Sequence, residues 1–401
     1  MIGTTPMTQR PPCYIFAGGG TGGHIYPGLA IAEQIRLLYA SGHGASTGGQ
    51  RSLLARCIFV VSTRAVDRTV VEPLGVEYVP LPAQPLGLHP RRLAKFVVSW
   101  GGAVRAAREV IQQAKATNGL VHVVTTGGFV AAPVAQAAHV ERVPVTLLNL
   151  DAIPGKANRF VAWRATQAFT TLPVTVPWGK AWKLVPPVVR AAATVQHSKA
   201  ECKIACGLDP TRPVLMVTGG SLGAGSLNSF VLAFVAAHGE VLRDGGWQVL
   251  HQTGSGSAGQ QEAWGDQLNA AYRGARVPAT VCEYCQTMGL WWGAADAAVS
   301  RAGAGAVAEA WASATPTIFV PYPYHKDQHQ RANARVLVDA GGAVCIDDQL
   351  QPAANLATLG PELGRLLTGE AIRTTMGVRL RALGPVDGAA RIAQAIVNAQ
   401  G

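Results

Sequence analysis

Two glycine-rich segments each follow a strand-like run and precede a helix-like run, and this arrangement can bind an anion. The first, Gly18-Gly-Gly-Thr-Gly-Gly23, follows residues 13–17, and the second, residues 219–223, follows residues 214–218. Small residues let backbone N–H groups approach an anion at a helix N-terminus. The first segment lacks the Gly-Lys-Ser/Thr ending of a Walker A loop, and no acidic residue at the next strand supports nicotinamide binding. Glycine needed only for a tight turn is the alternative interpretation.

A histidine closes the first glycine segment and is the candidate general base. His24 lies where the carboxyl ends of strands present ligands in a doubly wound sheet. An imidazole there can take a proton from a hydroxyl nucleophile near neutral pH. A histidine that only caps the following helix fits the position equally well.

The second half of the chain carries groups suited to a nucleotide. Ser221 adds a hydroxyl that can donate to a phosphate oxygen, and Ser300-Arg-Ala-Gly-Ala-Gly-Ala-Val-Ala-Glu309 contains a strand end, a small-residue turn and a helix start. Amides and the helix dipole there favour a diphosphate. Glu309, about a turn and a half into the helix, can accept paired hydrogen bonds from ribose hydroxyls. A solvated surface glutamate is the alternative.

A third polar segment follows the strand-like residues 317–320. Asp327, Gln330 and Asn333 recur every three residues, so one helical face would carry all three. Amides and carboxylates in a row suit the hydroxyls of a sugar. An ordinary polar helix face is the alternative.

The elements that position these groups are short apolar runs alternating with helical patterns. Buried strands separated by helices predict parallel sheets covered on both faces, the doubly wound α/β class. The 401 residues exceed the usual ~100–200 per domain and predict two such domains, joined near residues 172–187. Residues 42–50 are expected to form a flexible loop. The predicted strands are residues 13–17, 57–61, 121–125, 143–148, 214–218, 247–250, 297–300 and 317–320.

The amino-acid composition limits the kinds of partner and the location that we expect for this protein. Lys and Arg number 34 against 23 Asp and Glu, for a formal net charge of +11, yet only 14% of residues are charged. Scarce acids rather than dense basic runs produce this surplus, which argues against a nucleic-acid partner. No apolar run reaches the ~18 residues of a membrane span, and residues 1–12 have no signal-peptide core, so we expect a cytoplasmic location.

The seven cysteines fit reduced thiols rather than a disulfide framework. Two close pairs, Cys202 with Cys206 and Cys282 with Cys285, have unequal spacing and no zinc-knuckle surroundings. We therefore expect structural thiols and no metal site.

Several motifs in matching order resemble the MurG-type UDP-N-acetylglucosamine transferases, which convert lipid I to lipid II in bacterial peptidoglycan synthesis. The resemblance extends from Ile15 to about Ala399. Its most specific pieces are Gly19-Gly-Thr-Gly-Gly-His-Ile-Tyr-Pro27, Thr126-Gly-Gly-Phe-Val-Ala-Ala-Pro133, Ile153-Pro-Gly-Lys-Ala-Asn-Arg159, Gly219-Gly-Ser-Leu-Gly-Ala224, and residues 301–333.

The resemblance implies a GT-B fold, with two Rossmann-like domains facing across a cleft. Residues 11–185 would form the acceptor- and membrane-facing domain, completed by a final helix at about 386–401, and residues 186–385 would bind the UDP-sugar. The reaction implied is inverting transfer of GlcNAc from UDP-GlcNAc to the 4-hydroxyl of undecaprenyl-diphospho-MurNAc-pentapeptide, without a metal. The implied location is the cytoplasmic face of the bacterial membrane, with cell-wall synthesis or division proteins as possible partners.

The resemblance also assigns roles to single residues, with His24 as the catalytic base. The implied acceptor-phosphate contacts are Gly18, Gly19, Gly20, Gly127 and Gly128. The implied donor contacts are Thr21, Gly22, Gly23, Arg190, Ser221, Glu309, Gln330 and Asn333.

One segment departs from the family pattern. The family typically has His-Glu-Gln-Asn where this chain has Leu148-Asn-Leu-Asp151, and Ala302 replaces a commoner serine. Asp151 is therefore a second candidate for the general base, shared with or in place of His24. The departure also leaves open a transferase with a different lipid or small-molecule acceptor, and a non-catalytic sugar-nucleotide-binding protein.

A basic and aromatic segment is the candidate membrane patch. Residues 84–110 hold five basic side chains against one acidic one. Such a mixture can lie on an anionic bilayer, although an amphipathic helix facing a core gives the same pattern. The patch residues are Arg91, Arg92, Lys95, Phe96 and Trp100.

Overall fold

The computed structural model describes the chain in nine stretches and divides it into two compact units. The first unit comprises Met1–Leu150, Pro154–Arg190 and Asp387–Gly401, and the second comprises Asp151–Ile153 and Ala191–Val386. The predicted loop at residues 42–50 and part of the predicted linker, residues 175–180, lie outside the described residues. The described residues are 10–20, 22–41, 54–86, 89–174, 181–190, 197–220, 225–254, 261–324 and 327–399.

The first unit is built on a parallel sheet in the order β3-β2-β1-β4-β5-β6-β7. Side chains of β1 alternate between the two faces, so that Ile15 enters one apolar core and Phe16 the other. The strand order reverses between β1 and β4, the switch point where doubly wound sheets bind ligands. The strands are β1 Cys13–Gly18, β2 Arg56–Ser62, β3 Glu77–Leu81, β4 Val121–Gly127, β5 Val145–Asn149, β6 Gln167–Thr170 and β7 Lys183–Leu184.

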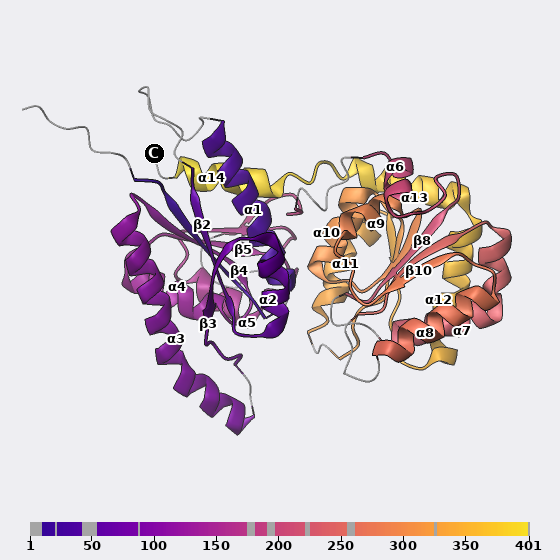
Figure 1. Ribbon diagram of the computed structural model, residues 1–401, viewed down its shortest axis with the longest axis horizontal. Helices are drawn as coiled ribbons and strands as arrows, with labels where there is room; N and C mark the ends of the chain where they lie inside the picture. The colour runs from indigo at the N-terminus through magenta and orange to yellow at the C-terminus, as the bar shows by residue number, and fades with distance from the viewer. Residues whose placement is uncertain are drawn as a thin grey trace, which may run out of the picture. The chain divides into compact units, whose positions relative to one another are not determined.

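Helices cover both faces of this sheet. On one face α3 and α4 contribute Ile111 and Val134 to the core, and on the other α1 and α14 contribute Ile35 and Ile392. The last helix, α14, lies beside α1 although the two are more than 340 residues apart in sequence (Figure 1). The helices are α1 Gly22–Ala40, α2 Ala65–Val71, the 3-10 turn η1 Glu72–Leu74, α3 Pro90–Thr117, α4 Ala131–Val140, α5 Lys156–Ala162 and α14 Gly388–Asn398.

The second unit repeats the architecture with a parallel sheet in the order β10-β9-β8-β11-β12-β13. Its switch point lies between β8 and β11. The second glycine segment follows β8, and the small-residue turn before Glu309 follows β11. The strands are β8 Val214–Thr218, β9 Gln248–Gln252, β10 Ala279–Cys282, β11 Ala297–Ser300, β12 Thr317–Phe319 and β13 Ala343–Cys345.

Eight helices surround the second sheet within the described residues. One of them, α7, has the length and apolar composition of a membrane span, a feature that was not anticipated from the sequence. It carries Leu227, Phe230 and Phe234 into the core beside the sheet. The helices are α6 Lys199–Ala205, α7 Gly225–Asp244, α8 Gln261–Gly274, α9 Met288–Ala294, α10 Ala304–Ser313, α11 His329–Asp339, α12 Pro352–Thr368 and α13 Glu370–Ala382.

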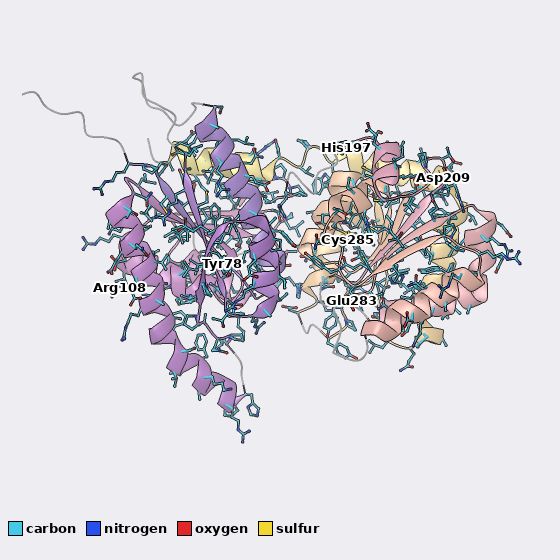
Figure 2. The ribbon with its side chains drawn as sticks, in the orientation of Figure 1. Tyr78, Arg108, His197, Asp209, Glu283 and Cys285 are labelled. Atoms are coloured by element: carbon cyan, nitrogen blue, oxygen red, sulfur yellow. The ribbon has the colours of Figure 1, made fainter. Side chains whose placement is uncertain are left out.

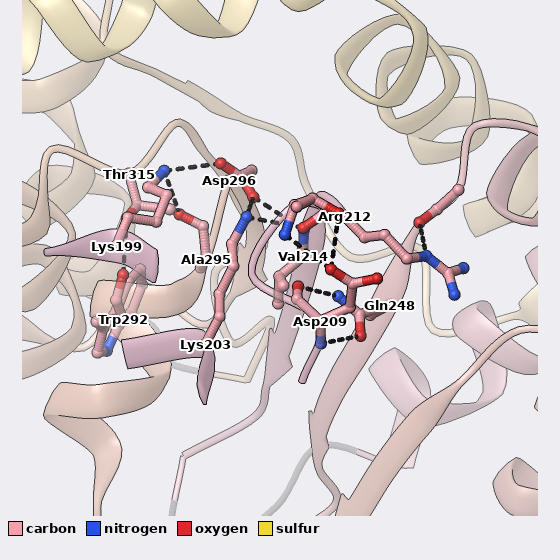
Figure 3. A network of polar contacts seen from close by, with 12 residues as sticks. Lys199, Lys203, Asp209, Arg212, Val214, Gln248, Trp292, Ala295, Asp296 and Thr315 are labelled. Carbon is pink, nitrogen blue, oxygen red and sulfur yellow. Dashed lines mark hydrogen bonds and ion pairs between the residues drawn. The ribbon is translucent and has the colours of Figure 1, made fainter. Parts of the chain in front are cut away.

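A polar network fixes the amino ends of β8 and β11 (Figure 3). Asp296 accepts from Lys199 Nζ and Lys203 Nζ, each at 2.8 Å, and from the Val214 backbone N–H at 3.0 Å. Burial opposes ionisation, but the two ammonium groups hold the pKa of Asp296 below its ordinary value. The charged groups of this network therefore lie at the amino ends of the strands, opposite the carboxyl ends that the second glycine segment and the turn before Glu309 follow.

Candidate functional site

The glycine segment of the first unit is held by a buried carboxylate. The Gly20 N–H donates to Asp67 Oδ1 at 3.0 Å and Oδ2 at 2.8 Å. The Ser62 N–H and hydroxyl donate to the same carboxylate at 2.9 and 2.6 Å. Asp67 is fully buried. Its role was missed because 47 residues separate it from Gly20 and only the fold brings the two together.

Close packing explains why this segment is rich in glycine. A Cβ on Gly19 would lie 2.6 Å from Asp67 Oδ2, and a Cβ on Gly20, whose φ is +96°, would lie 2.6 Å from the Phe129 ring. A Cβ on Gly128 would overlap the Gly19 carbonyl, and one on Gly18 would overlap Thr126 Oγ1. Packing therefore requires glycine here, and contact with an acceptor phosphate stays a prediction. Gly22 and Gly23 form the start of α1, whereas Thr21 lies outside the described residues.

His24 lies at the switch point of the first sheet. It is the third residue of α1, and its carbonyl accepts a hydrogen bond from Thr126 Oγ1 at the end of β4. Its half-buried ring packs over Gly127: a Cβ there would lie 2.9 Å from His24 Cδ2 and 3.3 Å from Nε2. Gly127, with φ +106°, thus leaves room for the imidazole at the carboxyl ends of β1 and β4.

An amide chain lies beside this imidazole. Asn158 Nδ2 donates to Asn149 Oδ1 at 2.9 Å, and Asn149 Nδ2 donates to Thr170 Oγ1 at 3.1 Å. Asn158 Oδ1 would lie 3.2 Å from a Cβ on Gly127 and has no hydrogen bond within the described part of the chain. Two of the residues that depart from the family pattern, Leu148 and Asn149, are therefore interior residues of β5, both fully buried.

Asp151, the second candidate for the general base, belongs to the second unit, as do the predicted sugar-binding amides Asn333 and Gln330. Asn333 is fully buried, and its Nδ2 donates to Asp151 Oδ1 at 2.9 Å and to the Ala302 carbonyl at 3.3 Å. Its Oδ1 accepts from the Ala152 N–H at 2.8 Å. The predicted sugar-binding amide thus holds the turn that contains Asp151, and a sugar hydroxyl would compete with these bonds. Gln330, at the start of α11, accepts from the Tyr322 N–H at 2.9 Å.

Glu309 lies on α10 directly after the switch point of the second sheet. Its Oε2 accepts from the Trp292 indole N–H at 2.8 Å. Burial raises the pKa of Glu309 to about 7, and the Trp292 hydrogen bond acts in the opposite direction. The predicted ribose-binding residue is therefore a half-buried carboxylate with a defined hydrogen-bond partner rather than a fully solvated one, and the sequence did not identify that tryptophan partner.

Arg301 connects the carboxyl ends of several strands of the second sheet. Its Nη2 lies 2.8 Å from Asp348 Oδ2 and 2.9 Å from Ser226 Oγ, and its Nη1 donates to the Val320 carbonyl at 2.9 Å. Burial raises the pKa of Asp348, but hydrogen bonds from Asn355 and Ser226 with the Arg301 charge bring it below its ordinary value. This buried ion pair gives the turn that follows β11 a rigid support.

Arg190 and Ser221 are the two residues predicted to contact the diphosphate of the donor. Arg190 belongs to the first unit, where its Nε lies 3.4 Å from Glu33 Oε1 and its guanidinium lies over the Tyr26 ring. Ser221 lies outside the described residues.

The candidate membrane patch occupies the first half of α3, which extends beyond the other elements of its unit (Figure 1). Arg91 and Lys95 are exposed, whereas the side chain of Arg92 is not among those that the structure describes. The sequence missed Val97 and Val98, which are 64% and 84% exposed. Phe96 and Trp100 are half-buried, with Trp100 packed edge-on against Phe160 of α5.

The second half of α3 is anchored to the body of the unit. Arg108 lies 2.9 Å from Glu141 at the end of α4 (Figure 2), and Ala107 and Ile111 are buried. The second half of α3 is therefore a helix that packs against the core, and the predicted membrane patch concerns only the first half.

All seven cysteines are free. Burial raises the pKa of Cys206 and of Cys282 to about 11, and it also raises the pKa of Cys202 and of Cys285. Among the residues that the structure describes, no group of three His, Cys, Asp or Glu side chains is placed to hold a metal ion.

Known proteins match both units. The glycosyltransferase family 28 N-terminal domain matches residues 14–170, and the family 28 C-terminal domain matches residues 214–362. A crystal structure of Acinetobacter baumannii MurG has a TM-score of 0.67 at 21% identity, covering 96% of this chain and 99% of its own. The calicheamicin glycosyltransferase CalG4 has a TM-score of 0.61 at 17% identity, covering 97% of this chain and 98% of its own. These structural matches identify the GT-B glycosyltransferase fold.

Sequence relatives narrow the class to one family. A Clavibacter sepedonicus protein named UDP-N-acetylglucosamine--N-acetylmuramyl-(pentapeptide) pyrophosphoryl-undecaprenol N-acetylglucosamine transferase is 34% identical over 96% of both chains. A Paenarthrobacter aurescens protein of the same name is 33% identical over 98% of this chain and 97% of its own. The chain belongs to the MurG-type glycosyltransferases of family 28.

Proposed function

We propose that this protein transfers GlcNAc from UDP-GlcNAc to the 4-hydroxyl of undecaprenyl-diphospho-MurNAc-pentapeptide, converting lipid I to lipid II for peptidoglycan synthesis. The observation that carries this proposal is the similarity to transferases of that name over 96% or more of both chains. The positions of His24 and Glu309 at the switch points of their sheets support it.

The residues of each unit supply a separate part of the proposed reaction. In the second unit the amides at the start of α10 face a diphosphate, and Glu309 accepts from the ribose. In the first unit His24 takes the proton of the acceptor hydroxyl as its oxygen attacks the anomeric carbon. The bond from that carbon to the UDP oxygen breaks, and helix amides with Arg190 stabilise the charge that UDP acquires. We propose that no metal takes part, and expect activity to survive EDTA.

A transfer assay tests this function. Radiolabelled UDP-GlcNAc and a short-chain lipid I analogue should give a labelled disaccharide lipid. Absence of that product, together with transfer to another acceptor, would overturn the proposal. UDP binding without any transfer would instead indicate a non-catalytic sugar-nucleotide-binding protein.

The general base can be assigned by comparing two variants at saturating substrates. His24→Ala should lower kcat by about 100-fold or more, because general base catalysis typically contributes roughly 10²–10⁴. Asp151→Ala should lower kcat far less, since its carboxylate accepts from Asn333. If Asp151→Ala alone loses kcat, Asp151 is the base and His24 is not.

A second candidate function keeps the donor and changes the acceptor. It is favoured by one observation, the carboxylate Asp151 where the family has an amide. The same assay with a panel of acceptors, including diacylglycerol, distinguishes the two functions by which acceptor is labelled.

We further propose that the protein binds the cytoplasmic face of the membrane through the first half of α3. This half of the helix carries the exposed apolar side chains of Val97 and Val98 together with the exposed basic side chains of Arg91 and Lys95. Apolar and basic groups on one surface suit an anionic bilayer. Peripheral attachment would give access to the lipid-linked acceptor and to cell-wall synthesis or division proteins.

Vesicle sedimentation tests this surface. Arg91→Glu/Lys95→Glu should reduce binding to vesicles containing phosphatidylglycerol, because each cation near the surface adds about 1 kcal/mol. Arg243→Glu, at the exposed end of α7, is the matched control and should bind normally. Equal binding by the wild type and both variants would contradict the proposed surface.

A further inference from the structure

We infer that Trp292 is a positioning residue of the donor site, whose indole N–H orients the Glu309 carboxylate for recognition of the ribose. This inference rests on the proposed function, because it needs a uridine nucleotide as the ligand. Trp292 does not itself touch the nucleotide. It acts through the single hydrogen bond from its Nε1 to Glu309 Oε2, at 2.8 Å.

The geometry leaves one carboxylate oxygen of Glu309 for a ligand. Oε2 accepts from Trp292, and Oε1 has no hydrogen bond with any residue that the structure describes. An ionised carboxylate has about four lone-pair directions, so one indole N–H leaves most of its acceptor capacity unused. Two adjacent ribose hydroxyls can donate to that remaining capacity. A carboxylate with one defined partner is therefore oriented without being saturated.

The tryptophan is held rigidly enough to impose this orientation. Its side chain is 1% exposed and packs in the apolar core with Val214, Ala295 and Phe319. Its carbonyl accepts from Thr315 Oγ1 at 3.2 Å (Figure 3). The indole is thus fixed at both its backbone and its ring, so the direction of its N–H is set by the core.

The hydrogen bond also bears on the charge of Glu309. Burial raises the pKa of Glu309 to about 7, and the Trp292 N–H stabilises the ionised form. Without that N–H, more of the carboxyl would be protonated near neutral pH, and a protonated carboxyl loses acceptor capacity. The helix α9 itself carries no titratable side chain, and the pKa of the nearby Cys285 thiol is raised, so this thiol stays neutral.

Helix α11 also packs against α10, and its charged side chains form ion pairs. At the start of α11, the ring of His329 lies 2.8 Å from the carboxylate of Asp327. Further along this helix, Arg331 pairs with Asp347 and Arg335 pairs with Asp339. None of these charges is among the causes that shift the pKa of Glu309. The indole N–H is therefore the group that opposes the effect of burial.

The variant Trp292→Phe removes the N–H and keeps an aromatic ring in the core. Trp291→Phe is the matched control, because Trp291 is the neighbouring buried tryptophan of α9 and its indole N–H makes no hydrogen bond with the residues that the structure describes. Replacement of Trp292 by benzothienylalanine, which has the shape of tryptophan with sulfur in place of N–H, serves as a second variant if the phenylalanine variant does not fold.

Calorimetry with UDP and 2′-deoxy-UDP reads the ribose contact directly in the full-length protein. The wild type and Trp291→Phe should bind UDP more tightly than 2′-deoxy-UDP. Trp292→Phe should weaken UDP binding about fivefold to tenfold at pH 7 and remove most of the preference. In transfer assays its KM for UDP-GlcNAc should rise with little change in kcat. In a Glu309→Gln background, Trp292→Phe should leave the UDP preference unchanged.

The outcomes separate this inference from the proposed function. If UDP binds and transfer proceeds, but Trp292→Phe keeps the wild-type preference for UDP over 2′-deoxy-UDP, the positioning role is wrong and the function stands. Tighter UDP binding by Trp292→Phe would mean that the indole competes with the ribose, and this too overturns the inference. If the wild-type protein binds no UDP at pH 6–8, the proposed function itself fails.

Discussion

Asp67 in the first unit and Glu309 in the second each lie on a helix that directly follows a strand of the parallel sheet, yet their surroundings differ. Asp67 accepts from the Gly20 N–H, the Ser62 N–H and the Ser62 hydroxyl, so its hydrogen-bonding capacity is used by the protein. Glu309 accepts from Trp292 alone among the residues that the structure describes. The contrast separates a structural carboxylate from the carboxylate of the proposed donor site: the first has its acceptor capacity used by the protein, and the second is oriented but left partly unsatisfied.

The largest effect is expected from removing the saturated carboxylate. Asp67→Ala leaves three buried donors without an acceptor and should lower the free energy of unfolding by about 3 kcal/mol. Thermal unfolding followed by circular dichroism should show a midpoint lower by about 6–12 °C. Asp244→Ala, on an exposed helix end, is the control and should be nearly neutral. An unchanged midpoint for Asp67→Ala would break the distinction between the two carboxylates.

Glu309→Gln should show the opposite profile, with activity lowered and stability at neutral pH kept or increased. The amide can still accept from Trp292, but the charge available to ribose hydroxyls is gone, so kcat/KM for UDP-GlcNAc should fall about 10–100-fold. Steady-state kinetics and thermal unfolding of the same preparation test both halves of the prediction. Equal kcat/KM in the two proteins would remove Glu309 from the donor site.

Because the pKa of Glu309 is raised, both the stability of the protein and its affinity for UDP should depend on pH. Because the folded-state pKa of about 7 exceeds the ordinary value of 4.5, the folded protein binds a proton more tightly than the unfolded chain. Wild-type stability should therefore fall as pH rises from about 4.5 to 7, relative to Glu309→Gln. UDP affinity should rise over the upper part of that window as the carboxyl ionises. Denaturant unfolding of both proteins across pH 5–8 measures the difference, and parallel curves would contradict it.

A smaller effect is expected at Gly127, which gives space to the His24 ring. Gly127→Ala places a Cβ 2.9 Å from His24 Cδ2 at a residue with φ +106°. We expect about 1–2 kcal/mol of lost stability from the backbone strain. Displacement of the imidazole should also lower kcat about tenfold. Gly364→Ala, on α12 with open space around it, is the control and should stabilise the helix slightly.

The smallest effect is expected at Asp151. Asp151→Asn keeps an oxygen that can accept from Asn333, so kcat should change less than about threefold. A loss of about 100-fold would assign the general base to Asp151.

Much of the fold could be predicted from apolar runs and glycine segments. All eight predicted strands are present, and β8 and β11 match residue for residue at 214–218 and 297–300. The strands that were missed, β3, β6, β7, β10 and β13, are shorter or flank the central strands, and exposed or partly exposed positions interrupt their apolar pattern. Tertiary pairing rather than local sequence defines such strands.

The site could be predicted in outline only. The sequence singled out His24 and Glu309 as candidates because each follows a small-residue turn at a strand end, and their roles stay predictions. Asp67, Asn158 and Trp292 could not be found this way, because their partners are 47, 9 and 17 residues away and the contacts exist only in the folded chain. The departure at Leu148 and Asn149 suggested a changed binding surface, whereas both side chains are interior.

The activity proposed for this protein is the formation of lipid II from lipid I. Its most direct test is structural identification of the product formed from UDP-GlcNAc and a short-chain lipid I analogue, by mass spectrometry and NMR. We predict one added N-acetylhexosamine, linked in the β configuration to the 4-hydroxyl of the muramoyl sugar. An unmodified lipid I analogue, alongside a glycosylated product from a different acceptor, would contradict it.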